Sequence, residues 1–140
     1  MYGALVAAGQ ASRNSCAAAL GTIAVETAST FAPVREAFWL DEDWRRRNLR
    51  YYPYYGRGYI QLTWDYNYRS AGAALGVDLV AAPDRAMEPD IAARVYAWYW
   101  TGHAIAAMAD RSDWAATRRA VQGGSDGLDR LRAICGALLA

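Results

Sequence analysis

One segment of eighteen residues, YYPYYGRGYIQLTWDYNY at 51–68, restricts the fold more than any other part of the chain. It holds seven of the ten tyrosines, and Pro53 with the two glycines around Arg57 would interrupt any regular helix or long strand. The segment therefore predicts an irregular loop that other elements must hold in place. Binding and catalytic residues concentrate in loops of this kind on a rigid scaffold.

Helical signals fill most of the remaining sequence and would supply that scaffold. We expect Ser15 to cap an alanine-rich helix that ends near Glu26, and Asp65 to cap a helix that Gly76 ends. Apolar and polar residues alternate at 59–63, and this pattern predicts a short extended piece. Further helices are expected around DEDWRRRN, from Pro89 onward, over WAATRRAVQ with Ser112 or Asp113 as its cap, and over 128–139. The sequence thus predicts a mainly α fold in a single domain, residues 1–140.

Composition excludes several classes of function. The 15 basic residues, all arginine, nearly balance 14 acidic ones, so no nucleic-acid partner is expected. No stretch is apolar enough to insert into a membrane, and the N-terminus has no signal-peptide pattern. Cys16 and Cys135 lack the spacing of a metal site, and free thiols or one disulfide both remain open. We expect no metal and no cofactor.

Two glutamates have surroundings that suit acid and base catalysis. Glu26 follows the apolar run GTIAV, where poor solvation favours the protonated form that a general acid needs. A surface glutamate is the simpler alternative. Glu36 comes ten residues later, across the turn at Pro33. Carboxyls placed in this way can face each other with room for a water between them, about 6.5 to 9.5 Å apart, as in inverting glycosidases.

The tyrosine-rich segment suits a sugar ligand. Aromatic faces pack against the C–H faces of sugar rings, and neutral side chains such as Gln61, Thr63 and Asn67 hydrogen-bond to hydroxyl and acetamido groups. A single-stranded nucleic acid would also use such aromatics, but it would require a basic groove in addition.

YYGRGYIQLTWDYNY resembles the signature of glycoside hydrolase family 19, which comprises chitinases and phage endolysins. VETASTFAPVRE is similar to the glutamate-bearing segment of that family, and VQGGSDGLDR to its later Asn-Gly-Gly motif. The matches follow the family order from about residue 20 to residue 132. The resemblance implies a lysozyme-like, two-lobed helical fold with a cleft. In its short length and in the sequence of this motif, the chain is most similar to the lytic domain of a bacteriophage endolysin. The lysine-free composition favours an actinobacterial, for example mycobacterial, host.

Roles for individual residues follow from this resemblance. It implies that Glu26 is the general acid, Glu36 the general base, and Thr63 the residue that positions the attacking water. It also implies that Arg130 and Asp126 orient the acid. The substrate-binding residues that it implies are Gln61, Tyr66, Asn67, Tyr55, Arg57 and Gln122.

Two departures from the family pattern affect these expectations. Val25 stands where the family often has a histidine, and Gln122 replaces the asparagine of Asn-Gly-Gly. The acidic residues Asp41, Glu42 and Asp43 compete with Glu36 for the role of base.

The function expected from the sequence is metal-free hydrolysis of the β-1,4 bonds of bacterial peptidoglycan by inversion. A chitinase is the first alternative, and a non-catalytic glycan-binding module is the second. A short chain leaves little room for extra loops, so we expect an open groove that accommodates the peptide stems of peptidoglycan. We also expect a monomer, either alone or excised from a longer modular lysin, that is made in the host cytoplasm and acts on the cell wall during phage lysis.

Overall fold

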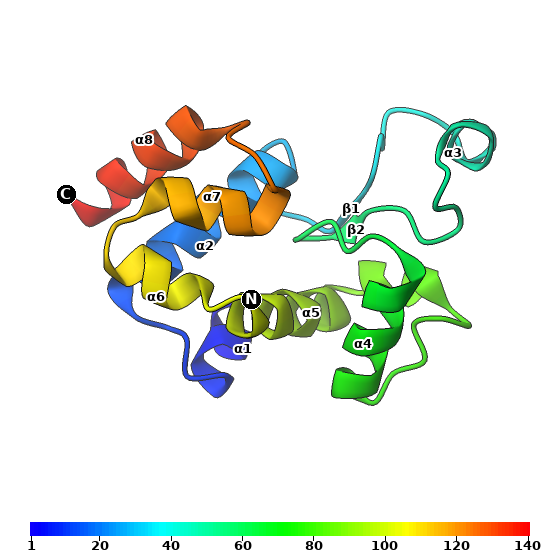
Figure 1. The fold of residues 1–140 in the computed structure, drawn as a ribbon, viewed down its shortest axis with the longest axis horizontal. Coiled ribbons are helices and arrows are strands. Elements are labelled where there is room, and N and C mark those ends of the chain that lie inside the picture. Colours follow the sequence, from blue (N-terminus) through cyan, green and yellow to red (C-terminus); the bar gives the residue numbers. More distant parts are fainter. The chain divides into compact units, whose positions relative to one another are not determined.

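The computed structural model describes residues 1–140, and most of them lie in helices (Figure 1). The mainly α fold predicted from the sequence is confirmed. Along the chain the elements are α1 (Tyr2–Ala7), α2 (Arg13–Glu26), β1 (Val34–Arg35), α3 (Glu42–Asn48), β2 (Arg57–Gly58), α4 (Asp65–Leu75), the 3₁₀ helix η1 (Pro83–Met87), α5 (Pro89–Gly102), α6 (Ile105–Asp110), α7 (Trp114–Gln122) and α8 (Leu128–Leu139).

The chain forms two compact units. The first unit consists of Met1–Phe31 and Ala97–Ala140, and the second unit consists of Ala32–Tyr96. The last turns of α5 therefore belong to the first unit and its earlier turns to the second. None of the helices has the length and apolar character of a membrane span.

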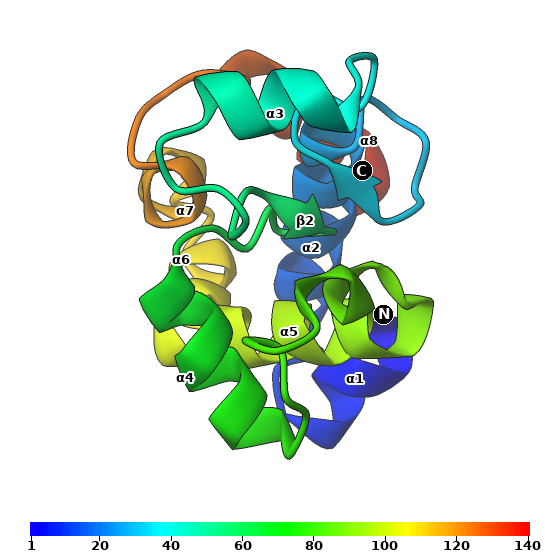
Figure 2. The ribbon, with the colours of Figure 1, turned by 90° about the vertical axis from the view of Figure 1, so that its right-hand side faces the viewer.

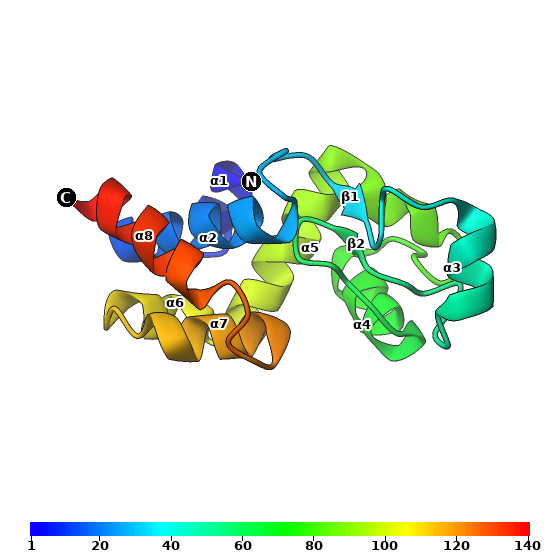
Figure 3. The same cartoon turned by 90° about the horizontal axis from the view of Figure 1, so that it is seen from above.

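In the first unit, α2 packs against α6, α7 and α8, and Figures 1 and 3 both show α8 alongside α2. Gly21 permits this approach, because a Cβ there would lie 2.7 Å from Leu131 Cδ1. Both cysteines are free thiols, so no disulfide joins α2 to α8. Cys135 is fully buried, and burial raises the pKa of its thiol to about 11, so the thiol is protonated at neutral pH.

The N-terminal cap of α2 differs from the expected one. The hydroxyl of Ser12, not that of Ser15, accepts the backbone N–H of Ser15 at 3.1 Å. Ser15 is itself buried inside the helix, where its hydroxyl accepts a hydrogen bond from Trp100 Nε1 at 2.9 Å. The prediction was wrong by three residues because a buried partner 85 positions away, which the sequence does not reveal, occupies Ser15.

In the second unit, β1 pairs with β2 in antiparallel fashion (Figures 2 and 3). Val34 lies opposite Gly58, and Arg35 lies opposite Arg57. The extended piece predicted at 59–63 is wrong. Arg57 bridges to Leu62 instead, and the intervening residues form a tight turn in which Gln61 has a φ of 56°. The irregular aromatic-rich loop expected from the sequence is thus closed on itself by backbone hydrogen bonds.

Helix α4 ends as predicted and begins differently. Gly76 has a φ of 68° and stops the helix. Asp65 lies inside the first turn, and the capping position belongs to Trp64, whose φ is 74° and whose side chain makes no capping hydrogen bond. The predicted Asp65 cap was therefore wrong, and the chain enters α4 through a strained tryptophan.

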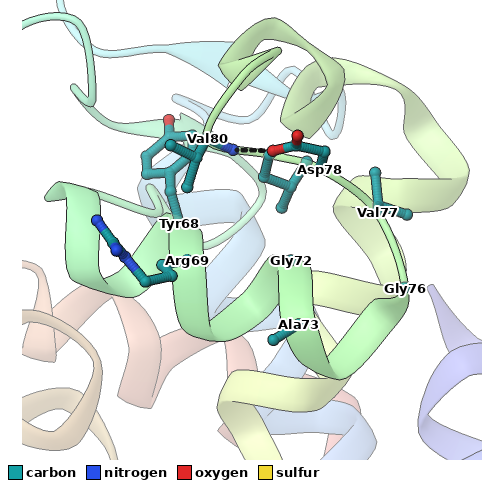
Figure 4. Close-up of a pocket in the computed structure, with 9 residues that line it drawn as sticks. Tyr68, Arg69, Gly72, Ala73, Gly76, Val77, Asp78 and Val80 are labelled. Atoms are coloured by element: carbon teal, nitrogen blue, oxygen red, sulfur yellow. Dashed lines mark hydrogen bonds between the residues drawn. The ribbon is translucent and has the colours of Figure 1, made fainter.

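A hollow of about 310 Å³ lies between α4 and the loop that follows it (Figure 4). Its lining includes Tyr68, Gly72 and Val80, and the backbone N–H of Val80 donates to the Asp78 carboxylate at 3.2 Å. None of the predicted site residues lines it, so we assign this hollow to packing of the loop on α4.

Gly72 is required where that loop crosses α4. A Cβ at Gly72 would lie 2.6 Å from the carbonyl oxygen of Val77, a backbone atom that cannot rotate away. We expect Gly72→Ala to lower the free energy of unfolding by about 1–2 kcal/mol, because overpacking exceeds the gain in helix propensity. The measurement is urea denaturation followed by circular dichroism.

The matched control is Gly136→Ala in α8, where nothing lies within 4 Å of the added Cβ. This substitution should leave stability unchanged or raise it by about 0.5–1 kcal/mol. Equal effects of the two substitutions would show that the contact with Val77 does not limit packing.

Candidate active site

Glu36 directly follows β1 and is half-buried, with both carboxylate oxygens hydrogen-bonded. Tyr51 Oη donates to Oε1 at 2.6 Å, and the backbone N–H of Gly56 donates to Oε2 at 2.9 Å. The backbone of Glu36 is fixed separately, because its N–H donates to Gly56 O at 2.7 Å and its carbonyl accepts from Arg45 Nε at 2.8 Å. The carboxylate is therefore held in one orientation.

The acidic residues that compete with Glu36 are all engaged elsewhere. Asp41 caps α3 by accepting the N–H of Trp44 at 2.7 Å. Glu42 accepts from Arg45 and from the Tyr55 hydroxyl, and Asp43 pairs with Arg46. Among the acidic residues at 36–43, Glu36 is the one whose carboxylate is bonded only by a neutral hydroxyl and a backbone N–H.

Gln61, Thr63 and Asn67 lie on the loop that faces β1 or just after it, and all three are half-buried. The Gln61 amide donates to Val34 O at 3.0 Å and to Gly58 O at 3.1 Å, which ties the loop to β1. Thr63 Oγ1 donates to Gln61 O at 2.8 Å and keeps lone pairs that can accept from a water. Asn67 donates to Thr63 O at 2.9 Å. These side chains thus fix the backbone around Thr63.

Tyr55 and Arg57 are buried beneath the loop, with 1% and 3% of their surfaces exposed. The Arg57 guanidinium lies 3.7 Å from the centre of the Tyr55 ring and pairs with Asp84 at 2.8 Å. Neither side chain has surface to offer a sugar. Their assignment as substrate-binding residues is therefore corrected: they shape the loop from inside.

An aromatic surface adjoins Glu36 in the second unit. Tyr66 is 57% exposed and stacks on Trp64, with ring centres 6.3 Å apart, and Trp64 in turn packs against Tyr51 at 4.9 Å. The Arg50 guanidinium lies 5.1 Å from the centre of the Trp64 ring, is exposed and forms no ion pair. Of the tyrosines predicted to bind substrate, Tyr66 is the accessible one. Trp64 and Arg50 were not singled out from the sequence.

Glu26 is the last residue of α2, and its side chain is 14% exposed. Its carboxylate accepts a hydrogen bond from the buried guanidinium of Arg118 in α7, which also donates to the backbone carbonyl of Asp126. Gly127 follows, and a Cβ there would lie 2.7 Å from Val25, so Val25 packs directly against this turn. The acid predicted from the sequence is thus held by an arginine.

That arginine is not the predicted one. Arg130 donates to the Ser29 hydroxyl, and Asp126 contributes its backbone carbonyl, not its carboxylate. The assignment of Arg130 and Asp126 as the pair that orients Glu26 is therefore corrected to Arg118. A signal was available in the sequence, because Trp114, Arg118 and Val121 fall on one face of α7, and a charge on an apolar face needs a buried partner.

Gln122 lies at the C-terminal end of α7 and is exposed. Its Oε1 accepts the backbone N–H of Gly124 at 2.9 Å, so the longer amide folds back on the glycine turn. Its predicted contact with substrate stays a prediction.

Strained backbone gathers beside the predicted acid, base and water-positioning residues. Eight residues other than glycine have a positive φ, and six of them lie within five residues of Glu26, Glu36 or Thr63. These six are Ala28, Ser29, Phe31, Ala37, Gln61 and Trp64. Such conformations cost about 1–3 kcal/mol each and cluster at functional sites.

No group of three or more His, Cys, Asp or Glu side chains is placed to hold a metal ion.

The sequence of this chain is similar to sequences of known proteins. A family model described as chitinase class I, from glycoside hydrolase family 19, matches residues 41–112, just over half of the chain. This chain belongs to glycoside hydrolase family 19. Among curated family 19 relatives, endochitinase EP3 of Arabidopsis thaliana is 35% identical over 119 residues, which is 80% of this chain and 42% of that protein. Chitinase 11 of Oryza sativa subsp. japonica is 57% identical over 49 residues, 34% of this chain and 19% of that protein.

Solved structures of chitinases share the fold. Chitinase C from Streptomyces griseus HUT6037 superposes with a TM-score of 0.71 at 24% identity, over 91% of this chain and 60% of that one. The class IV chitinase from Zea mays gives a TM-score of 0.68 at 23% identity, over 91% and 70% of the two chains. The lysozyme-like helical fold is thus confirmed, and the chain spans less than half the length of the Arabidopsis relative.

Proposed function

We propose that this family 19 chain is the hydrolytic domain of an endolysin that cleaves β-1,4 bonds of bacterial peptidoglycan by inversion. The observation that carries the proposal is the setting of the two glutamates. Each is partly buried, Glu26 as the last residue of α2 and Glu36 just after β1, each is held by a hydrogen-bond donor, and each is followed by backbone at positive φ. Strain retained beside two fixed carboxyls is typical of acid and base catalysis.

The proposed reaction uses one water and no cofactor. Glu26 donates its proton to the glycosidic oxygen as the bond from C1 to that oxygen breaks. Glu36 accepts a proton from water, and the water oxygen bonds to C1 from the opposite face. Thr63 accepts a hydrogen bond from that water. The products are two sugar hydroxyls, and solvent returns the proton from Glu36 to Glu26.

The surface beside Glu36 supports peptidoglycan as the substrate. Tyr66 and Trp64 present aromatic rings to a sugar, and Arg50 adds an exposed cation without a carboxylate partner. Peptidoglycan carries carboxylates on its peptide stems, whereas chitin is neutral. We propose further that the enzyme acts as a monomer and reaches the wall from the host cytoplasm during phage lysis.

Chitin hydrolysis is the second candidate, and the names of the relatives favour it, because those curated proteins are called chitinases or endochitinases. The two candidates share a mechanism and differ in the groups that project from alternate sugars. A non-catalytic glycan-binding module is the third, and it would release no reducing ends from either substrate.

Side-by-side release of reducing ends decides among these candidates. We expect purified actinobacterial peptidoglycan to be cut faster than chitohexaose at matched sugar concentration, with new muropeptide ends visible by mass spectrometry.

We expect Arg50→Gln to slow cleavage of peptidoglycan several-fold and to leave chitohexaose unaffected, since a screened surface charge contributes up to about 1 kcal/mol. Arg47→Gln, on the exposed side of α3, is the control. Rapid cleavage of chitohexaose with intact peptidoglycan would establish the chitinase instead.

A further inference from the structure

Tyr51 has no role in the sequence motifs, yet it is the only side chain that hydrogen-bonds to the Glu36 carboxylate. Its hydroxyl donates to Glu36 Oε1 at 2.6 Å, a length typical of a strong O–H···O⁻ bond. We propose that Tyr51 is a positioning residue that holds Glu36 for its role as general base. This inference rests on the proposed function, because it assumes that Glu36 activates the water.

Each oxygen of the Glu36 carboxylate accepts one of the two bonds, an arrangement that suits a base. Oε1 accepts from Tyr51 and Oε2 accepts from the N–H of Gly56, so each oxygen keeps a lone pair that can take a proton from water. Gly56 is the first glycine of the Gly-Arg-Gly turn, and a side chain does not fit at this position. A Cβ there would lie 3.3 Å from Glu36 Oε2 and 2.8 Å from Gln61 Oε1. The turn fixes one oxygen, and Tyr51 fixes the other.

The Tyr51 hydroxyl is a donor over the whole working range of pH. Burial, followed by the hydrogen bond to Glu36, raises the pKa of Tyr51 to about 12, although the charge of Arg50 opposes this. The other charged groups around Glu36 do not bond to its carboxylate. Arg45 donates to the backbone carbonyls of Glu36 and Ala37, and Glu42 accepts from Arg45 and Tyr55. Tyr51 therefore supplies a constant, neutral donor.

The ring of Tyr51 is anchored independently of its hydroxyl. It packs against Trp64 with ring centres 4.9 Å apart, and Trp64 stacks on the exposed Tyr66. A phenylalanine at position 51 would keep this packing and lose only the bond to Glu36. The substitution therefore separates the positioning role from the fold of the loop.

The test is Tyr51→Phe, assayed on whichever of soluble peptidoglycan strands or chitohexaose proves the better substrate. We expect kcat to fall about 10- to 100-fold with KM within twofold, because a carboxylate free to rotate is less often aimed at the water. The matched control is Tyr52→Phe, whose hydroxyl makes no hydrogen bond and whose ring stacks on Tyr55 at 6.1 Å. That variant should stay within twofold of the wild type.

The pH profile separates positioning from a purely structural effect. The bond from Tyr51 is stronger to the ionised carboxylate than to the protonated carboxyl, so the acid limb of kcat/KM should move to higher pH in Tyr51→Phe and stay in place in Tyr52→Phe. A fall in kcat without this movement, or activity within twofold of the wild type, would overturn the inference. Activity retained by Glu36→Gln would instead overturn the assignment of the base, whatever Tyr51→Phe shows.

Discussion

Glu26→Gln is expected to lower turnover by about a thousandfold while folding and glycan binding stay near wild type. The amide has the shape of the acid and can still accept a hydrogen bond from Arg118, but it has no proton to give to the glycosidic oxygen. The loss should therefore appear in kcat and leave KM nearly unchanged. The measurement is initial-rate release of reducing ends, with circular dichroism as the check on folding.

The control for Glu26→Gln is Glu88→Gln. Glu88 is exposed and pairs with Arg85 at the surface, so its loss removes a carboxylate without touching the site. That variant should keep the wild-type rate. A Glu26→Gln protein that retains more than a tenth of the wild-type rate would remove Glu26 from the role of general acid.

Glu36→Ala should lower turnover by about 10²- to 10⁴-fold, because water would have to attack without a base. Alanine leaves a space beside Tyr51 and the N–H of Gly56, and azide can enter it and attack without needing a base. We expect azide to restore part of the rate and to yield a glycosyl azide of inverted configuration. Rate measurements with and without azide, followed by NMR of the product, make the comparison.

Asp43→Ala serves as the control for Glu36→Ala, because Asp43 lies in the neighbouring acidic run and pairs with Arg46 on the surface. It should keep full activity and gain nothing from azide. Loss of activity in Asp43→Ala with azide rescue, and none in Glu36→Ala, would transfer the role of base to α3.

Local signals in the sequence predicted several helix ends correctly. Gly76 ends α4 with a positive φ, Asp113 caps α7 through the N–H of Ala116, and the last helix covers 128–139 as expected. Each of these signals depends on residues no more than four positions apart, so the local sequence is enough to recognise it. The mainly α fold follows from the same kind of information.

The details that the sequence did not predict depend on residues far apart along the chain. Ser15 looked like a cap and is instead bonded to Trp100. Arg118 rather than Arg130 meets Glu26, 92 positions away, and Tyr51 meets Glu36 across 15 positions. Tyr55 and Arg57 belong to the family motif but lie inside the protein. A motif therefore identifies which residues matter without stating which of them touch a ligand.

The most direct test of the central claim, hydrolysis by a general acid and a general base, is the anomeric form of the first product. Proton NMR of the new reducing end, recorded in the first minutes on a β-1,4-linked substrate, distinguishes the α from the β anomer before they interconvert. We predict the α anomer, the result of one attack by water on the face opposite the leaving oxygen. Initial formation of the β anomer would mean a double displacement and would contradict the roles assigned to Glu26 and Glu36.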